Sequence, residues 1–136
     1  MDPVLLDTDT LSEIVKLRNM VVVRRALAYT RQVGMLTFSA FTRYEVLRGY
    51  KRRGASTQLA RFHVSCDESQ VLPVTDAIWN RASDLWSEAR NSGRPCEDAD
   101  LVIAATAMEH ELTLVTGNID HFSWIPGLTL DDWRNV

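Results

Sequence analysis

The sequence predicts an α/β domain with a mainly parallel central sheet flanked by helices. Short apolar runs typical of strands alternate along the chain with longer runs that have apolar residues at helical spacing. Turn residues such as Gly34, Gly54 and Gly93 separate these runs. The 136 residues contain no internal repeat, low-complexity tract or linker, so we expect one domain over residues 1–136.

Each expected element follows from its own pattern. The expected strands are short apolar stretches bounded by turn residues, at residues 4–6, 35–38, 70–74, 112–115 and 128–130. The expected helices are the longer amphipathic or apolar stretches between them, at residues 11–18, 20–31, 40–53, 57–67, 76–92 and 99–111. This alternation favours crossover connections and therefore a parallel sheet.

Composition excludes several classes of protein. An apolar content of 46% with 24% charged residues is typical of a folded globular chain. Cys66 and Cys96 lie far apart without a partner motif, so we expect reduced thiols. No stretch reaches the roughly 18 apolar residues of a membrane span, and the first residues do not form a basic segment followed by a long apolar stretch. We therefore expect a cytoplasmic protein without a membrane partner.

The net charge of −3 argues against a protein that binds nucleic acid by bulk attraction. Basic residues are nevertheless concentrated in one segment, which contains Arg43, Arg48, Lys51 and Arg52. A basic rim beside an acidic centre can hold phosphates, and we expect this segment to contact the phosphates of a substrate beside a bound metal. For any single arginine, a solvated helix face is the simpler explanation.

Four polar residues stand beside apolar runs that would hold them in the interior: Asp7, Glu45, Asp100 and Asn118. Buried carboxylates need compensation, and a cation commonly provides it. Asp7 follows the first expected strand and Thr116 follows the fourth, and parallel strands end at one edge of a sheet. Acidic side chains gathered at this edge predict a magnesium or manganese site and phosphodiester hydrolysis.

Taken singly, these acidic residues have ordinary structural explanations. Asp98 is a good N-cap for the helix expected from residue 99, and Asp100 would complement the dipole of that helix. Thr10 and Glu13 have the spacing of a capping box. Glu45 alone would be an ordinary helix residue. Only the combination indicates a site.

The histidines are His63, His110 and His121, and their sequence contexts suggest no acid–base pair. We expect them to have surface or structural roles.

Several segments in order along the chain resemble those of PIN-domain proteins of the VapC toxin type. They are Leu5–Asp9, Thr42–Gly49, Gly93–Pro95, Asp100–Ala105, Leu114–Asn118 and Phe122. The match covers essentially the whole chain. The resemblance implies a metal-dependent endoribonuclease that is the toxin of a type II toxin–antitoxin pair. It also implies an RNA substrate, a cognate VapB-like antitoxin and a homodimer.

Asp7, Glu45 and Asp100 match the three principal acids of the family. The resemblance implies that Asp7 and Asp100 are the main ligands of Mg²⁺, with Mn²⁺ able to substitute, and that Glu45 contributes directly or through water. All three are therefore expected to be catalytic.

The sequence departs from the family at two positions. Many relatives have a fourth acid where Asn118 follows Thr116 and Gly117, and the asparagine weakens the case for a second metal ion. Asp98 or Asp120 could compensate. Asp9 stands where relatives often have asparagine.

Alternatives from other classes remain open. A response-regulator receiver also binds magnesium at strand ends, but it requires a lysine after a late strand, and no lysine follows Lys51. A housekeeping PIN nuclease of RNA processing would share the acidic site. A PIN-fold interaction module with weak catalysis is conceivable because of Asn118.

Overall fold

The computed structural model describes residues 1–135. Its elements in chain order are β1 (Val4–Leu6), α1 (Thr8–Val15), α2 (Met20–Val33), β2 (Thr37–Ser39), α3 (Ala40–Arg53), α4 (Ser56–Asp67), β3 (Gln70–Leu72), α5 (Asp76–Asn91), α6 (Asp98–Glu109), β4 (Thr113–Val115), α7 (Ile119–Phe122) and β5 (Leu130–Asp131).

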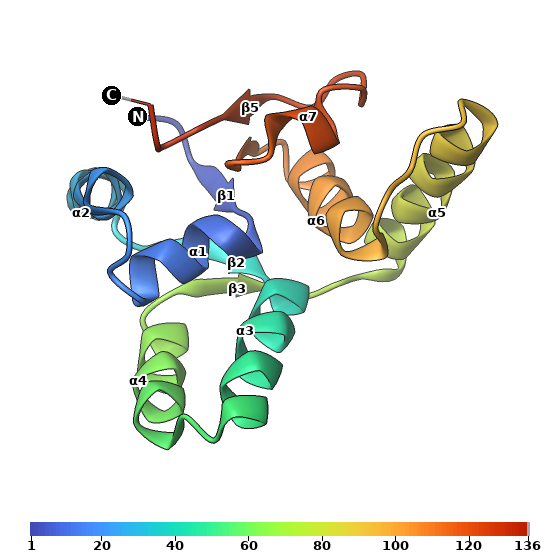
Figure 1. Ribbon diagram of the computed structural model, residues 1–136. Coiled ribbons are helices and arrows are strands. Elements are labelled where there is room, and N and C mark those ends of the chain that lie inside the picture. Colours follow the sequence, from blue (N-terminus) through green and yellow to red (C-terminus); the bar gives the residue numbers. More distant parts are fainter. Residues whose placement is uncertain (136) are drawn as a thin grey trace.

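The five strands form one sheet in the order β3-β2-β1-β4-β5, and every neighbouring pair is parallel. The predicted α/β architecture is confirmed (Figure 1). The chain builds outward from β1 to β2 and β3 on one side, and then adds β4 and β5 on the other. The strand order therefore reverses between β1 and β4, and parallel α/β sheets bind ligands beyond the carboxyl ends of the strands at such a point.

Alternation along β1 divides the interior into two cores, because successive side chains of a strand point to opposite faces of the sheet. Leu5 packs with residues of α5, α6 and α7. Leu6 packs on the other face with residues of α1, α2, α3 and α4. Leu5 and Leu6 are completely buried, and each contributes about 1.5–3 kcal/mol by leaving water. Helices thus cover both faces of the sheet.

The caps of two helices differ from those expected. α1 begins at Thr8 rather than residue 11, because the Asp7 carboxylate caps it by accepting a 2.8 Å hydrogen bond from the Thr10 amide. The expected capping box of Thr10 and Glu13 is therefore absent. α6 begins at Asp98 after the N-cap residue Glu97, so Asp98 is the first helical residue rather than the cap.

Smaller differences concern β2, which lies at Thr37–Ser39 rather than residues 35–38, and α7, a single turn that the sequence did not predict. Cys66 and Cys96 are free thiols, as expected. Within residues 1–135, every helix is too short or too polar to cross a membrane.

Candidate functional site

Asp7 lies at the carboxyl end of β1, at the point where the strand order reverses. Its amide donates a 3.0 Å hydrogen bond to the Val115 carbonyl, which ties it to β4. The residue is only 4% exposed. Burial raises the pKa of the Asp7 carboxyl above its ordinary value of 3.8, although hydrogen bonds from Thr116 and Thr10 act in the opposite direction. The carboxyl end of β1 thus holds a buried carboxyl group whose protonated form is stabilised by burial.

Asp100 occupies the first turn of α6, whose following residues 101–107 are all buried. This apolar anchor fixes the position of the carboxylate at the end of the helix. Burial raises the pKa of the Asp100 carboxyl, and the negative charge of Asp7 raises it further, whereas His121 acts in the opposite direction. The Asp100 carboxyl therefore lies close enough to Asp7 for the charge of Asp7 to disfavour its ionisation.

Glu45 is held in place by neighbours on α1 and α3. The Thr8 hydroxyl donates a 2.6 Å hydrogen bond to Oε1 of Glu45, and the Arg48 guanidinium lies 3.5 Å from Oε2. The side chain is 16% exposed. The predicted inward orientation of Glu45 is consistent with this burial. Thr8, which follows Asp7 directly, links the second acid of the site to the first.

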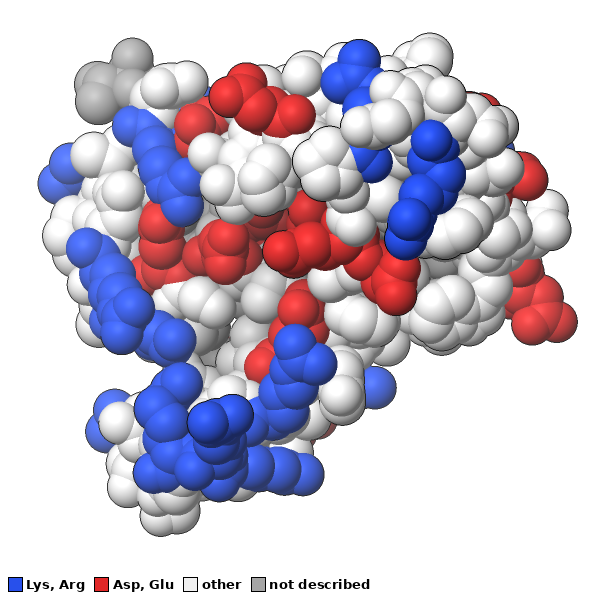
Figure 2. Space-filling model, turned by 45° about the vertical axis from the view of Figure 1, so that its right-hand side comes forward, with Lys and Arg blue, Asp and Glu red and all other residues white. Residues whose placement is uncertain are grey.

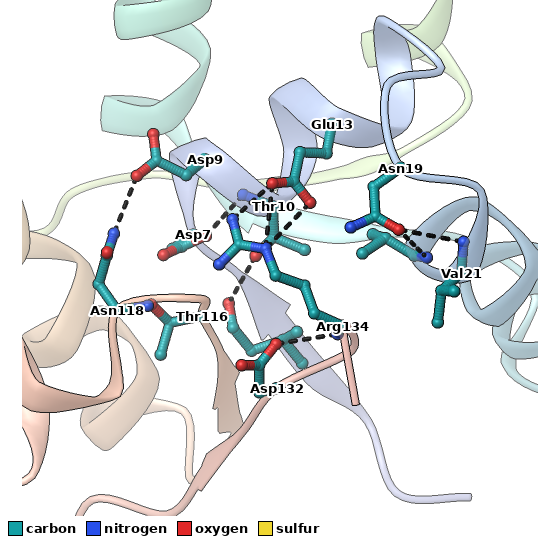
Figure 3. A network of polar contacts seen from close by, with 12 residues as sticks. Asp7, Asp9, Thr10, Glu13, Asn19, Val21, Thr116, Asn118, Asp132 and Arg134 are labelled. Atoms are coloured by element: carbon teal, nitrogen blue, oxygen red, sulfur yellow. Dashed lines mark hydrogen bonds and ion pairs between the residues drawn. The ribbon is translucent and has the colours of Figure 1, made fainter. Parts of the chain in front are cut away.

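Asn118 and Thr116 form the turn that follows β4. Thr116 is completely buried, and its hydroxyl oxygen accepts a 2.9 Å hydrogen bond from the Asn118 amide. Nδ2 of Asn118 donates a 2.9 Å hydrogen bond to Oδ2 of Asp9 (Figure 3). Asn118 therefore contacts the first turn of α1 at the edge of the same crevice that Asp7 occupies.

Asp120 and Asp98 differ in their relation to Asp100. A cavity of about 350 Å³ is lined by Asp100, Asp120, His121 and Trp124, among others, and neither Asp98 nor Asp7 lines it. Nδ1 of His121 lies 3.2 Å from Oδ2 of Asp100. Of the two acids expected to compensate for Asn118, Asp120 is the one that shares a cavity with Asp100.

The charged side chains are unevenly distributed over the surface. Acidic side chains gather in a hollow across the middle of the face shown in Figure 2, and basic side chains gather beside it and at the lower end of the view. Arg43, Arg48, Lys51 and Arg52 are all exposed on α3, and Lys51 and Arg52 lie in its last turn. The acidic crevice is therefore flanked by cationic groups.

The donor set of the crevice fits a hard divalent cation that retains water. Across residues 1–135, no group of three or more His, Cys, Asp or Glu side chains is arranged to hold one metal ion. Asp7 and Asp100 nevertheless offer two carboxylates within electrostatic reach of each other, and magnesium sites in proteins commonly have one or two carboxylates, with waters and substrate phosphates completing the coordination. A cation here would offset the cost of burying these carboxylates, which is the main cause of both raised pKa values.

Comparison with known proteins identifies the family. The PIN domain model matches residues 4–127, and the chain therefore belongs to the PIN-domain family. The chain is 34% identical over 122 residues to Ribonuclease VapC10 of Mycobacterium tuberculosis, a match that covers 88% of this chain and 85% of that protein.

Solved structures agree with this assignment. A DNA-bound VapBC from Salmonella typhimurium has a TM-score of 0.85 and 25% identity, and the match covers 98% of this chain and 99% of that one. VapBC2 from Rickettsia felis, also bound to DNA, has a TM-score of 0.84 over 95% of this chain and 97% of that one. Its 20% identity supports the fold alone.

Sequence reasoning missed three contacts at the site. His121 was expected to have no acidic partner, yet it lies against Asp100. The hydrogen bond from Thr8 to Glu45 was not anticipated, nor was an ion pair between Glu13 and Arg134. These partners lie far apart in the sequence, and no local pattern marks them.

Proposed function

We propose that this protein is a metal-dependent endoribonuclease and the toxin of a VapBC-type toxin–antitoxin pair. The observation that supports this most strongly is a buried carboxyl group, Asp7, at the point where the strand order reverses, with Asp100 close enough for the charge of Asp7 to act on it. Burial raises the pKa of both carboxyls, and a bound cation would offset that cost. The similarity to Ribonuclease VapC10 supports RNA as the substrate.

Asp7 and Asp100 would hold Mg²⁺, and Mn²⁺ would substitute for it because both ions accept oxygen ligands. Bound there, the cation would lower the pKa of a water molecule and neutralise charge that develops on the attacked phosphate. Asp7 is buried and hydrogen-bonded to Thr10, so its carboxylate is preorganised. Asp100 is fixed by the apolar anchor of α6.

Glu45 would accept the proton of the attacking water. Its Oε1 receives the Thr8 hydrogen bond and its Oε2 lies near Arg48, so both oxygens are oriented by the protein. Thr116 would orient Asp7, because its hydroxyl donates to that carboxylate. Asn118 offers a carbonyl oxygen without charge, so a second divalent ion would bind weakly. Asp120 would assist from the cavity that it shares with Asp100.

The basic residues of α3 would guide the RNA strand to the acidic crevice. Arg43, Arg48, Lys51 and Arg52 are exposed on one helix that also positions Glu45. Cations along the path of a backbone attract phosphates without reading the bases. This arrangement would bring a phosphate towards the carboxylates despite the net negative charge of the protein.

We infer that the protein works in the cytoplasm as a homodimer and is inhibited by a VapB-like antitoxin. Both structural neighbours described above are VapBC assemblies. An antitoxin that covers the crevice would need cationic side chains to complement Asp7 and Asp100.

A cleavage assay with single-stranded RNA tests the proposal. Purified protein should cleave RNA with Mg²⁺ or Mn²⁺ and be inert in EDTA, and Asp100→Asn should cleave at less than about 1% of the wild-type rate. If the wild type has no activity with either ion, the interaction module is the better explanation. Induced expression should also arrest growth unless an adjacent antitoxin gene is co-expressed. Cleavage without growth arrest would indicate a housekeeping nuclease.

A further inference from the structure

Arg134 reaches the rim of the acidic crevice from the carboxyl-terminal segment, which follows β5. Its Nε lies 3.1 Å from Oε1 and 3.3 Å from Oε2 of Glu13, and its Nη2 lies 2.5 Å from Oε1. Its backbone amide donates a 2.9 Å hydrogen bond to Oδ1 of Asp132. Figure 3 shows the guanidinium beside Glu13, on the side of α1 that faces Asp7 and Thr116.

The guanidinium occupies the place that a side chain at position 117 would take. A Cβ added to Gly117 would lie 1.0 Å from Nη1 of Arg134 and 2.0 Å from its Cζ. No real Cβ tolerates such distances, so the glycine is what allows the guanidinium to lie against the turn that joins Thr116 to Asn118. The Arg134 guanidinium therefore packs against the turn from Thr116 to Asn118 as well as pairing with Glu13.

The Arg134 side chain is not fully enclosed by the protein. Glu13 receives hydrogen bonds from Nε and Nη2, and Nη1 lies against Gly117. The Arg134 side chain is 33% exposed. The hydrogen bond with Glu13 raises the pKa of Arg134, and the charge of Asp7 acts in the same direction. A permanent cation thus stands within electrostatic reach of the buried carboxylate.

Anchoring of the chain end does not depend on Arg134 alone. Nη1 of Arg25 donates hydrogen bonds to the carbonyls of Asp132 at 3.2 Å and Asn135 at 2.9 Å. Trp133 is buried against Tyr29, with ring centroids 5.5 Å apart. These contacts hold the segment on α2. None of these anchoring contacts involves the Arg134 guanidinium. Its position against the turn from Thr116 to Asn118 is therefore a separate feature.

We propose that the exposed part of the Arg134 guanidinium binds a phosphate of the RNA strand beside the carboxylates of the site, while Glu13 holds the guanidinium in orientation. The inference rests on the proposed function and names a further residue that contacts the substrate. A guanidinium presents several N–H donors in a fixed plane and suits phosphate oxygens better than an ammonium group does. Its charge would offset the repulsion between RNA phosphates and Asp7.

Binding and cleavage measurements on matched variants test this. Affinity for a fluorescein-labelled single-stranded RNA would be measured by anisotropy in Ca²⁺ over a range of salt concentrations, and cleavage would be measured in Mg²⁺. Arg134→Gln should lower kcat/KM about 10- to 100-fold and reduce the slope of log affinity against log salt by about 0.7. Arg134→Lys should keep the slope but recover only part of kcat/KM. Arg25→Gln removes a cation that anchors the same segment and should match wild type in both.

Gly117→Ala tests the position of the Arg134 guanidinium without removing its charge. The added methyl should displace the guanidinium and lower kcat/KM, and it should have little further effect when Arg134 is already Gln. If Arg134→Gln behaves like Arg25→Gln in slope and kcat/KM, or if the effects of Gly117→Ala and Arg134→Gln simply add, the inference is wrong. A wild type that cleaves RNA while Arg134→Gln is unaffected overturns this inference alone. A wild type that neither binds nor cleaves RNA overturns the proposed function as well.

Discussion

Nδ2 of Asn118 donates a 2.9 Å hydrogen bond to Oδ2 of Asp9, which joins the turn after β4 to the first turn of α1. The family resemblance leads one to expect asparagine at position 9 and an acid at position 118. This chain has the reverse. The hydrogen bond needs one amide and one carboxylate, because two carboxylates at this distance would repel each other. We predict that the two departures from the family compensate for one another.

Asn118→Asp should lower the unfolding free energy of the metal-free protein and increase its affinity for divalent ions. The substitution replaces the hydrogen bond with two facing carboxylates and should cost about 1 kcal/mol of unfolding free energy in EDTA. Added charge beside the crevice should strengthen binding of Mn²⁺ in calorimetric titration. The double variant Asp9→Asn/Asn118→Asp should regain wild-type stability. Equal stability of the single and double variants would contradict this coupling.

The stability of the metal-free protein should include a component from Asp7 and Asp100 that falls as the pH rises. Both pKa values are raised from 3.8 in the folded protein, so the folded state binds these protons more tightly than the unfolded state. Their contribution to stability is full below pH 3.8 and is lost as the pH rises through the raised folded values.

Urea unfolding in EDTA at a series of pH values between about 4 and 7 measures this component. The curve of the double variant Asp7→Asn/Asp100→Asn should decline less with pH than that of the wild type. Parallel curves would show that the two carboxyls do not titrate abnormally.

Thr8→Val should lower kcat while leaving the protein folded. The substitution removes the 2.6 Å hydrogen bond to Glu45 and leaves that carboxylate free to reorient. Loss of a group that orients a catalytic residue typically costs about 10-fold or more. Thr8→Ser keeps the hydroxyl and should retain most of the wild-type rate. Equal kcat for Val and Ser variants would show that Thr8 does not position Glu45.

Lys51→Gln combined with Arg52→Gln should weaken RNA binding without changing which bonds are cut. Both side chains are exposed at the end of α3, and phosphate contacts are insensitive to sequence. The slope of log affinity against log salt should fall by about 0.7 for each phosphate that the variant no longer neutralises. Arg61→Gln, on the neighbouring α4, is a control for a general loss of charge. An equal effect of Arg61→Gln would argue against a defined RNA path on α3.

The fold and the two central acids could be predicted because their signals are local. The apolar run of β1 ends directly at Asp7, and the apolar run of α6 directly follows Asp100. The parallel topology then brings these two positions together. The start of α1 was mispredicted because Asp7 both caps the helix and faces the crevice. The helix therefore begins inside a segment that we expected to be a loop.

The contacts that sequence could not predict are those between distant polar residues. Glu13 and Arg134 are separated by 121 positions, and Asp100 and His121 by 21. Such pairs depend on how the carboxyl-terminal segment and the short α7 fold back over the sheet edge. Neither segment has a strong hydrophobic period, so their paths are set by tertiary packing.

The metal-binding role of Asp7 is tested most directly by a paired measurement on Asp7→Asn: the rate of RNA cleavage in Mg²⁺ and the unfolding free energy in EDTA. Asparagine can still cap α1 but has no charge to hold the metal. We expect cleavage to fall below about 1% of wild type while stability stays the same or rises. Asp84→Asn, exposed on α5, should match wild type in both. Cleavage by Asp7→Asn at the wild-type rate would contradict the central role of this carboxylate.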